Sequence, residues 1–101
     1  MQMLRYVEEH YAEELTVEKL AGCVALSESA CLRSFRQFLG ITPIQYVKQC
    51  RVEKAAELLR STRLKTGEVG LECGFSDASY FIKTFREIKH CTPREYRIRF
   101  C

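Results

Sequence analysis

Residues 66–97 carry the pattern that most restricts how this chain can fold. A short apolar segment ends at Gly74, and glycine turns a chain at little conformational cost. Ser76 or Asp77 then stands where the N-cap of a new helix is expected. Three apolar side chains follow at spacings of four and three, which places them on one helical face: Phe81, Phe85 and Ile88. The pattern predicts a short helix, a tight turn and a longer amphipathic helix.

The outer face of that longer helix is partly basic. It carries Ala78, Ser79, Ile82, Lys83 and Arg86. Thr92-Pro93 closes the run and begins another short helix, because proline is favoured at the first helical position. A short helix, a glycine turn and a second helix with a basic outer face are the parts of a helix-turn-helix that reads DNA.

The N-terminal part predicts two amphipathic helices. The first has an apolar stripe and a glutamate-rich outer face, and the second is short and follows the candidate N-cap Thr16. The stripe consists of Leu4, Val7, Tyr11 and Leu15, and the short helix carries Val17, Leu20 and Ala21.

Two longer helices are predicted next. The first covers about Glu28 to Leu39, with Ser27 as its N-cap and Gly40 as its stop. Its inward residues are expected to be Cys31, Phe35 and Phe38 or Leu39. The second runs from Pro43 to about Arg60, roughly 27 Å at 1.5 Å per residue. Its apolar stripe is expected to contain Ile44, Val47, Arg51, Ala55 and Leu58.

The two halves of the chain repeat the same pattern. Leu26-Ser27 matches Phe75-Ser76, Phe35 matches Phe85, and Tyr46 matches Tyr96, while Gly40-Ile41-Thr42-Pro43 matches His90-Cys91-Thr92-Pro93. The offset is 49 residues before the second helix and 50 after it, which implies one inserted residue in the second copy. Two copies of one pattern joined by a long helix are far more specific than a single helix-turn-helix.

Charge and cysteine content agree with this interpretation without requiring it. Residues 1–50 carry five Lys/Arg against six Asp/Glu, and residues 51–101 carry eleven against seven. The basic second half fits a nucleic-acid partner, although a small excess is also common on a solvated surface. The six cysteines form no zinc-type cluster, and we expect buried or half-buried thiols and no metal site. No membrane span or signal peptide is visible, so we expect a cytoplasmic protein.

Three sets of residues form a recognisable signature. The second unit carries Gly74-Phe75-Ser76-Asp77, Ser79-Tyr80-Phe81, Phe85 and Thr92-Pro93-x-x-Tyr96-Arg97. The first unit agrees through Leu20-Ala21, Ser27, Arg33-x-Phe35, Gly40-x-Thr42-Pro43 and Tyr46, and the linker through Arg51, Ala55, Leu58 and Leu59. With these motifs the sequence resembles the AraC/XylS family of bacterial transcription regulators from about Leu4 to Arg97.

The resemblance implies an all-α domain of about seven helices, with two helix-turn-helix subdomains joined by a long linker helix. The expected ranges are 16–40 and 66–90 for the subdomains, 43–60 for the linker and 93–99 for the C-terminal helix. The recognition helices, about 28–39 and 77–89, would enter successive major-groove segments of double-stranded DNA. The linker's roughly 27 Å is compatible with the roughly 34 Å of one DNA turn.

Three positions depart from the family pattern. His90 and Gly70 stand where glycine and alanine are usual, and Cys31 occupies a position where leucine is common. Histidine tolerates a left-handed conformation, so the helix stop survives with some strain. Gly70 is expected to loosen its helix by up to about 1 kcal/mol. Together they suggest a slightly underpacked domain.

Resemblance and helical phase together select the candidate DNA-reading residues. They are Ser29, Ala30, Leu32, Arg33 and Arg36 in the first unit, and Ala78, Ser79, Tyr80, Ile82, Lys83 and Arg86 in the second. Arg33 and Lys83 are candidates for base or phosphate contacts, and Arg36 and Arg86 for phosphates. Leu32 and Ile82 suit a thymine methyl or a protein surface, and Tyr80 suits either DNA or packing.

No catalytic constellation or cofactor motif is visible, so we expect no enzyme activity and no cofactor. The main alternative to a DNA-binding domain is a helical protein-interaction module that contacts RNA polymerase or another regulator domain. Relatives usually carry this domain behind an N-terminal effector or dimerisation domain. We therefore expect either an excised domain or a stand-alone member, and activation as the commoner family behaviour.

Overall fold

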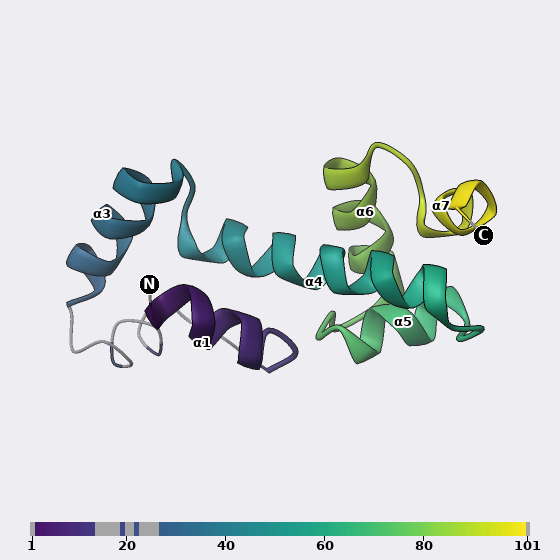
Figure 1. Cartoon of the computed structure of the whole chain (residues 1–101), viewed down its shortest axis with the longest axis horizontal. Helices are drawn as coiled ribbons and strands as arrows, with labels where there is room; N and C mark the ends of the chain where they lie inside the picture. The colour runs from purple at the N-terminus through teal and green to yellow at the C-terminus, as the bar shows by residue number, and fades with distance from the viewer. Residues whose placement is uncertain (1, 14–18, 20–21, 23–26, 101) are drawn as a thin grey trace. The chain divides into compact units, whose positions relative to one another are not determined.

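The chain is all helical in the part that the computed structural model describes, residues 2–13, 19, 22 and 27–100. Its helices are α1 (Gln2–His10), α3 (Glu28–Leu39), α4 (Pro43–Ser61), α5 (Thr66–Glu72), α6 (Ala78–Lys89) and α7 (Pro93–Phe100) (Figure 1). No strand occurs in these ranges, which confirms the predicted fold class. The expected short helix near residues 17–21 and its N-cap Thr16 lie outside them.

The chain divides into two compact units, residues 1–50 and 51–101. In the first unit the core consists of Val7, Cys31, Phe35 and Val47, with Tyr6, Tyr46 and Cys50 packed against it. These residues come from α1, α3 and the first part of α4. The core therefore fixes the inner face of α3.

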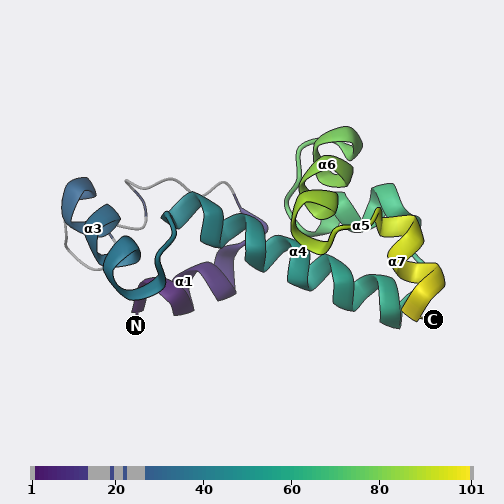
Figure 2. The ribbon, with the colours of Figure 1, turned by 90° about the horizontal axis from the view of Figure 1, so that it is seen from above.

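Aromatic rings form the centre of the second unit. Phe75, Phe81, Phe85 and Tyr96 follow one another with ring centroids 5.1, 5.8 and 5.4 Å apart. Figure 2 shows α5, α6 and α7 gathered along the second half of α4. Val52, Ala55, Ala56 and Leu59 of α4 are fully buried. The rings thus anchor the inner face of α6.

Two apolar faces differ from the predicted ones. Phe38 is 70% exposed and Leu39 37%, so neither points inward as expected on α3. On α4, Ile44 is 41% exposed, whereas Val52 and Ala56 are buried although they lay off the predicted stripe. The reason is that α4 contributes to both units, so its buried positions do not follow one stripe.

The turn between α5 and α6 follows the predicted glycine signal. Gly74 has φ 96°, and the N–H groups of Phe75 and Gly74 donate to the carbonyls of Gly70 and Leu71 at 3.0 and 3.1 Å. This is the Schellman arrangement, which ends α5 and satisfies its last carbonyls. Asp77 then begins α6 as its N-cap.

Gly70 corrects the expectation of a loosely packed helix. A Cβ added to Gly70 would come 2.6 Å from two ring carbons of Phe81 and 3.0 Å from the Phe81 Cβ. Gly70 itself is buried. The absence of a side chain at this position therefore allows α6 to approach α5 closely, and the underpacking expected there is wrong.

Each Thr-Pro pair begins a helix with a capping box. The N–H of Thr42 donates to Gln45 Oε1 at 2.9 Å, and the N–H of Gln45 donates to Thr42 Oγ1 at 3.2 Å. Thr92 and Glu95 make the same two bonds at 2.9 and 3.1 Å. These bonds satisfy orphan donors at the starts of α4 and α7, which explains why Thr-Pro recurs.

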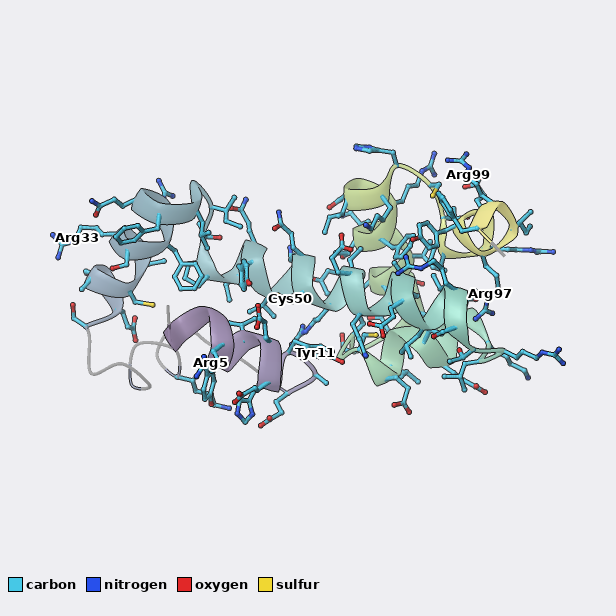
Figure 3. The ribbon with its side chains drawn as sticks, viewed as in Figure 1. Arg5, Tyr11, Arg33, Cys50, Arg97 and Arg99 are labelled. Carbon is cyan, nitrogen blue, oxygen red and sulfur yellow. The ribbon has the colours of Figure 1, made fainter. Side chains whose placement is uncertain are left out.

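Arg97 joins α7 to the end of α4 and the segment that follows it. Its guanidinium donates to the carbonyls of Leu59, Leu64 and Thr62 at 3.1, 2.6 and 3.3 Å. Figure 3 shows the Arg97 side chain beside these elements. One side chain thus satisfies three backbone acceptors next to the start of α5.

Among the described helices, none is both long and apolar enough to cross a membrane.

Candidate nucleic-acid interface

Helix α3 has one buried face and one exposed face. Its N-cap Ser27 accepts a hydrogen bond from the Ala30 N–H at 3.1 Å, as predicted. Gly40 ends the helix in the left-handed conformation, with φ 73°. Cys31 and Phe35 are completely buried and hold the helix in the first unit. Ala30, one of the five candidate reading residues, is half-buried. The other four are exposed: Ser29, Leu32, Arg33 and Arg36.

Helix α6 is built in the same way. Asp77 Oδ1 accepts from the Tyr80 N–H at 2.8 Å, and His90 ends the helix with φ 63°. The left-handed conformation expected at His90 is therefore confirmed. Phe81, Thr84 and Phe85 are buried. The candidate residues are all exposed, with Tyr80 and Ile82 at 37% and 40%: Ala78, Ser79, Tyr80, Ile82, Lys83 and Arg86.

The N-caps correct one detail of the sequence repeat. Ser27 was matched to Ser76, but the residue that caps α6 is Asp77, 50 positions after Ser27. The inserted residue of the second copy therefore precedes the N-cap. From the caps to the ends of α3 and α6 the two copies keep a constant offset.

The cations on these two faces have no ion-pair partner within the described residues. Arg33, Arg36 and Lys83 make no side-chain hydrogen bond or salt bridge there, and Figure 3 shows Arg33 extending from α3 into solvent. The pKa of Glu95 is lowered mainly by its hydrogen bonds with Thr92, and the positive charge of Arg86 makes a smaller contribution. By contrast, Lys89 of the same helix pairs with Glu53 at 2.6 Å. Exposed cations without a counter-ion are available to an anionic ligand.

A shallow hollow lies on the exposed face of α6. It is lined by Ser79, Ile82, Lys83, Arg86 and Glu87. Four of these were candidates from the sequence, whereas Glu87 was not. Its spacing of four from Lys83 places it on the same face, so helical phase could have identified it. The hollow combines an aliphatic side chain, two cations and a carboxylate on one helix.

Tyr80 has a packing role in addition to its exposure. Its ring meets Phe75 edge-on, with centroids 5.7 Å apart. Phe75 is nearly buried and lies between the turn and the core. Tyr80 therefore packs against the segment that precedes α6. The matching position of α3 is Ala30, which is half-buried.

The titratable groups with the largest shifts lie away from both faces. Burial raises the pKa of Cys73 to about 11. Burial also raises the pKa of Tyr46 to about 12, and Cys50 and Glu8 add to that increase. Cys31, Cys73 and Cys91 are buried thiols and Cys50 is half-buried, as expected; Cys23 and Cys101 lie outside the described residues. Desolvation in a core explains these shifts without a chemical site.

Two capped helices, each anchored by aromatic residues and each exposing cations without an ion-pair partner in the described part of the chain, define a double helix-turn-helix domain. A family model described as "Helix-turn-helix domain" matches residues 20–99. The chain belongs to the AraC/XylS family of helix-turn-helix DNA-binding domains.

The relatives are transcription regulators. The chain is 38% identical to the uncharacterized HTH-type transcriptional regulator YdeC of Bacillus subtilis, over 95% of this chain and 33% of the relative. It is 35% identical to the HTH-type transcriptional activator RhaS of Enterobacter sp., over 95% of this chain and 34% of the relative. The chain thus spans about a third of the length of these curated relatives.

Solved structures share the fold along nearly the whole chain. A transcriptional regulator from Chromobacterium violaceum, described as containing an AraC-type DNA-binding domain, superimposes with a TM-score of 0.94 and 32% identity, over 99% of this chain and 89% of that one. The DNA-binding domain of AdpA, a global transcriptional factor in complex with a target DNA, gives 0.91 and 30%, over 97% and 88%.

Proposed function

We propose that this domain binds double-stranded DNA sequence-specifically through α3 and α6, each in a major-groove segment, and thereby regulates transcription. The observation that carries the proposal is the pair of exposed helical faces, held by the cores of two separate units, whose cations have no ion-pair partner among the residues that the structure describes. A helix of this kind fits the width of the major groove. The membership of the chain in a DNA-binding family supports the same conclusion.

The side chains on the two faces divide into base contacts and phosphate contacts. Arg33 and Lys83 lie near the middle of their helices and suit a guanine edge. Arg36 and Arg86 lie one turn later and suit phosphates, which position the protein without specifying sequence. Leu32 and Ile82 provide apolar contacts for thymine methyl groups.

In the proposed function, this domain works together with other domains of a longer regulator. Because the relatives are about three times as long, we assign effector sensing or dimerisation to another domain of the full regulator. Activation is the proposed direction, since one relative is an activator. The site of action is the bacterial cytoplasm, where the DNA is, and no enzymatic step is needed.

The test is a fluorescence-anisotropy titration of random-sequence duplex DNA at two salt concentrations, with sequencing of the bound fraction. Binding that weakens with salt and enriches defined motifs is expected. Arg33→Ala and Lys83→Ala should each weaken binding to the enriched duplex. As a matched control, Lys65→Ala removes an exposed cation that lies on neither helix. Failure to bind at low salt would exclude the proposal.

A protein-interaction module remains the second candidate, and one observation favours it. Leu32 and Ile82 are 36% and 40% exposed at matching positions of the two helices, where a partner such as RNA polymerase could cover them. Arg33→Ala separates the two functions: it should weaken DNA binding while a polymerase contact through Leu32 persists unchanged. In the second candidate, Leu32→Ser would weaken polymerase binding and leave DNA affinity unchanged.

A further inference from the structure

We infer that α3 and α6 read nearly the same bases, so that the DNA site of one domain consists of two near-identical half-sites. This inference rests on the proposed function and adds the sequence organisation of the DNA. It depends on an equivalence between the two helices that extends from their caps to their exposed side chains.

The helices are in the same register. Each has 12 residues, and each begins and ends at positions 50 residues apart. Ser27 and Asp77 accept from the N–H groups of Ala30 and Tyr80. At the other end, the N–H groups of Gly40 and His90 donate to the carbonyls of Arg36 and Arg86 at 3.0 and 2.9 Å. The same cap bonds fix the same helical phase.

The inner faces preserve that phase in the packing. The ring of Phe35 packs at a tilt against Tyr46 with centroids 6.0 Å apart, and the ring of Phe85 meets Tyr96 edge-on at 5.4 Å. Each phenylalanine lies on the reading helix, and each tyrosine lies three residues after the proline of the Thr-Pro pair that follows that helix. Each helix is therefore rotated similarly against its own unit.

The exposed faces then carry matching chemistry at matching positions. In each helix a serine, a branched aliphatic residue, a cation and an arginine follow at i, i+3, i+4 and i+7. They are Ser29, Leu32, Arg33 and Arg36 on α3, and Ser79, Ile82, Lys83 and Arg86 on α6. All eight are exposed. A homeodomain recognition helix reads its bases from four positions with the same spacing.

Matching side chains at matching positions select matching bases. A branched aliphatic side chain favours a thymine methyl, and either arginine or lysine favours the O6 and N7 acceptors of guanine. Because the two groups are adjacent along each helix, each half-site contains a thymine beside a guanine, in the same order. The two faces differ at two other pairs of matching positions, where the half-sites are expected to differ: Ala30 corresponds to Tyr80, and Gln37, which favours adenine, corresponds to Glu87, which accepts from the amino group of cytosine.

The decisive experiment selects bound duplexes from a random pool with the whole 101-residue chain and sequences them. Two copies of one short motif within each bound duplex are the expected result. Two dissimilar motifs, or a single motif, would overturn the inference while leaving the proposed function intact. Salt-dependent binding without an enriched motif would overturn sequence-specific binding itself, and the inference with it.

Two matched variants make the comparison residue by residue. Arg33→Ala should reduce the preference for guanine at one position of one half-site, and Lys83→Ala should reduce it at the corresponding position of the other. In each case the ratio of the affinity for guanine to the affinity for another base should fall about tenfold. Both side chains are exposed and unpaired within the described residues, so unchanged thermal melting is expected and serves as the folding control. Relaxation at two different positions of the half-sites would overturn the inference. Leu32→Ile with Arg33→Lys, which makes the four positions identical, should retain the selected sequence.

Discussion

The side chain of Phe81 lies directly over the backbone of Gly70. A Cβ at Gly70 would come within 2.6 Å of the ring and 3.0 Å of the Phe81 Cβ. Because the Phe81 Cβ belongs to the start of the side chain, rotation of the ring alone does not relieve the overlap. This contact sets the approach of α6 to α5, and α6 carries half of the candidate interface.

We predict that Gly70→Ala destabilises the second unit. Alanine contributes up to about 1 kcal/mol of helix propensity, but displacing Phe81 costs about 1–3 kcal/mol. The expected net loss is about 1 kcal/mol in the free energy of unfolding, measured by urea denaturation. Gly67→Ala is the control, because a Cβ there meets only Ala78 at 4.0 Å. Equal stabilisation by both substitutions would contradict the close approach.

Local signals predicted the ends of the helices better than their buried faces. Ser27, Gly40 and Asp77 act through bonds to residues at most four positions away, so their roles are visible in the sequence. The same holds for the left-handed conformation of His90. These caps fix the positions of the two reading helices along the chain.

Burial and close approach depend on contacts between distant segments. A helical wheel places Phe38 near Phe35 but does not give the width of the covered face, and Phe38 proved to be exposed. Likewise, whether a side chain fits at position 70 depends on Phe81, which lies next to Gly70 only in the folded protein. The candidate reading residues were predicted from phase and resemblance, and their contacts with DNA stay predictions.

His90→Gly should stabilise the protein. His90 holds φ 63° at the end of α6, and a left-handed conformation costs a residue with a Cβ about 1 kcal/mol. Greater freedom of glycine in the unfolded chain offsets part of the gain, so we expect about 0.5 kcal/mol by thermal denaturation. Gly40→His is the reciprocal variant, with φ 73° and no atom within 4 Å of the added Cβ. It should destabilise the protein; stabilisation by Gly40→His would show that left-handed strain is not the cause.

Arg97→Gln should lower the free energy of unfolding by about 2 kcal/mol. The substitution removes the guanidinium that donates to Leu59, Thr62 and Leu64, and hydrogen bonds from charged donors contribute about 1.5–3 kcal/mol. Urea denaturation measures the change, and Arg94→Gln on the same helix is the control because Arg94 is exposed. If the two variants were equally stable, the three bonds would contribute nothing.

Alkaline pH should destabilise the fold through Cys73. Burial raises the pKa of this thiol from 9.0 to about 11 in the folded protein, so the unfolded chain loses its proton first. The stabilising effect is complete below pH 9 and is lost as the pH rises toward 11, which amounts to roughly 2–3 kcal/mol. Urea denaturation from pH 8 to pH 11 should show this decline, and Cys73→Ala should make the decline shallower. An unchanged slope in the variant would assign the effect to other groups.

The salt dependence of DNA binding should report phosphate contacts by Arg36 and Arg86. Each phosphate contact releases counter-ions, so the logarithm of affinity falls with the logarithm of salt concentration by about 0.9 per contact. Replacing either arginine by glutamine should therefore reduce that slope by about 1 and weaken binding to all sequences alike. Anisotropy titrations on one enriched and one scrambled duplex measure both effects. Arg33→Gln provides the contrast, because loss of a base contact should narrow the affinity difference between the two duplexes. If Arg36→Gln narrowed that difference instead, Arg36 would be a base-reading residue.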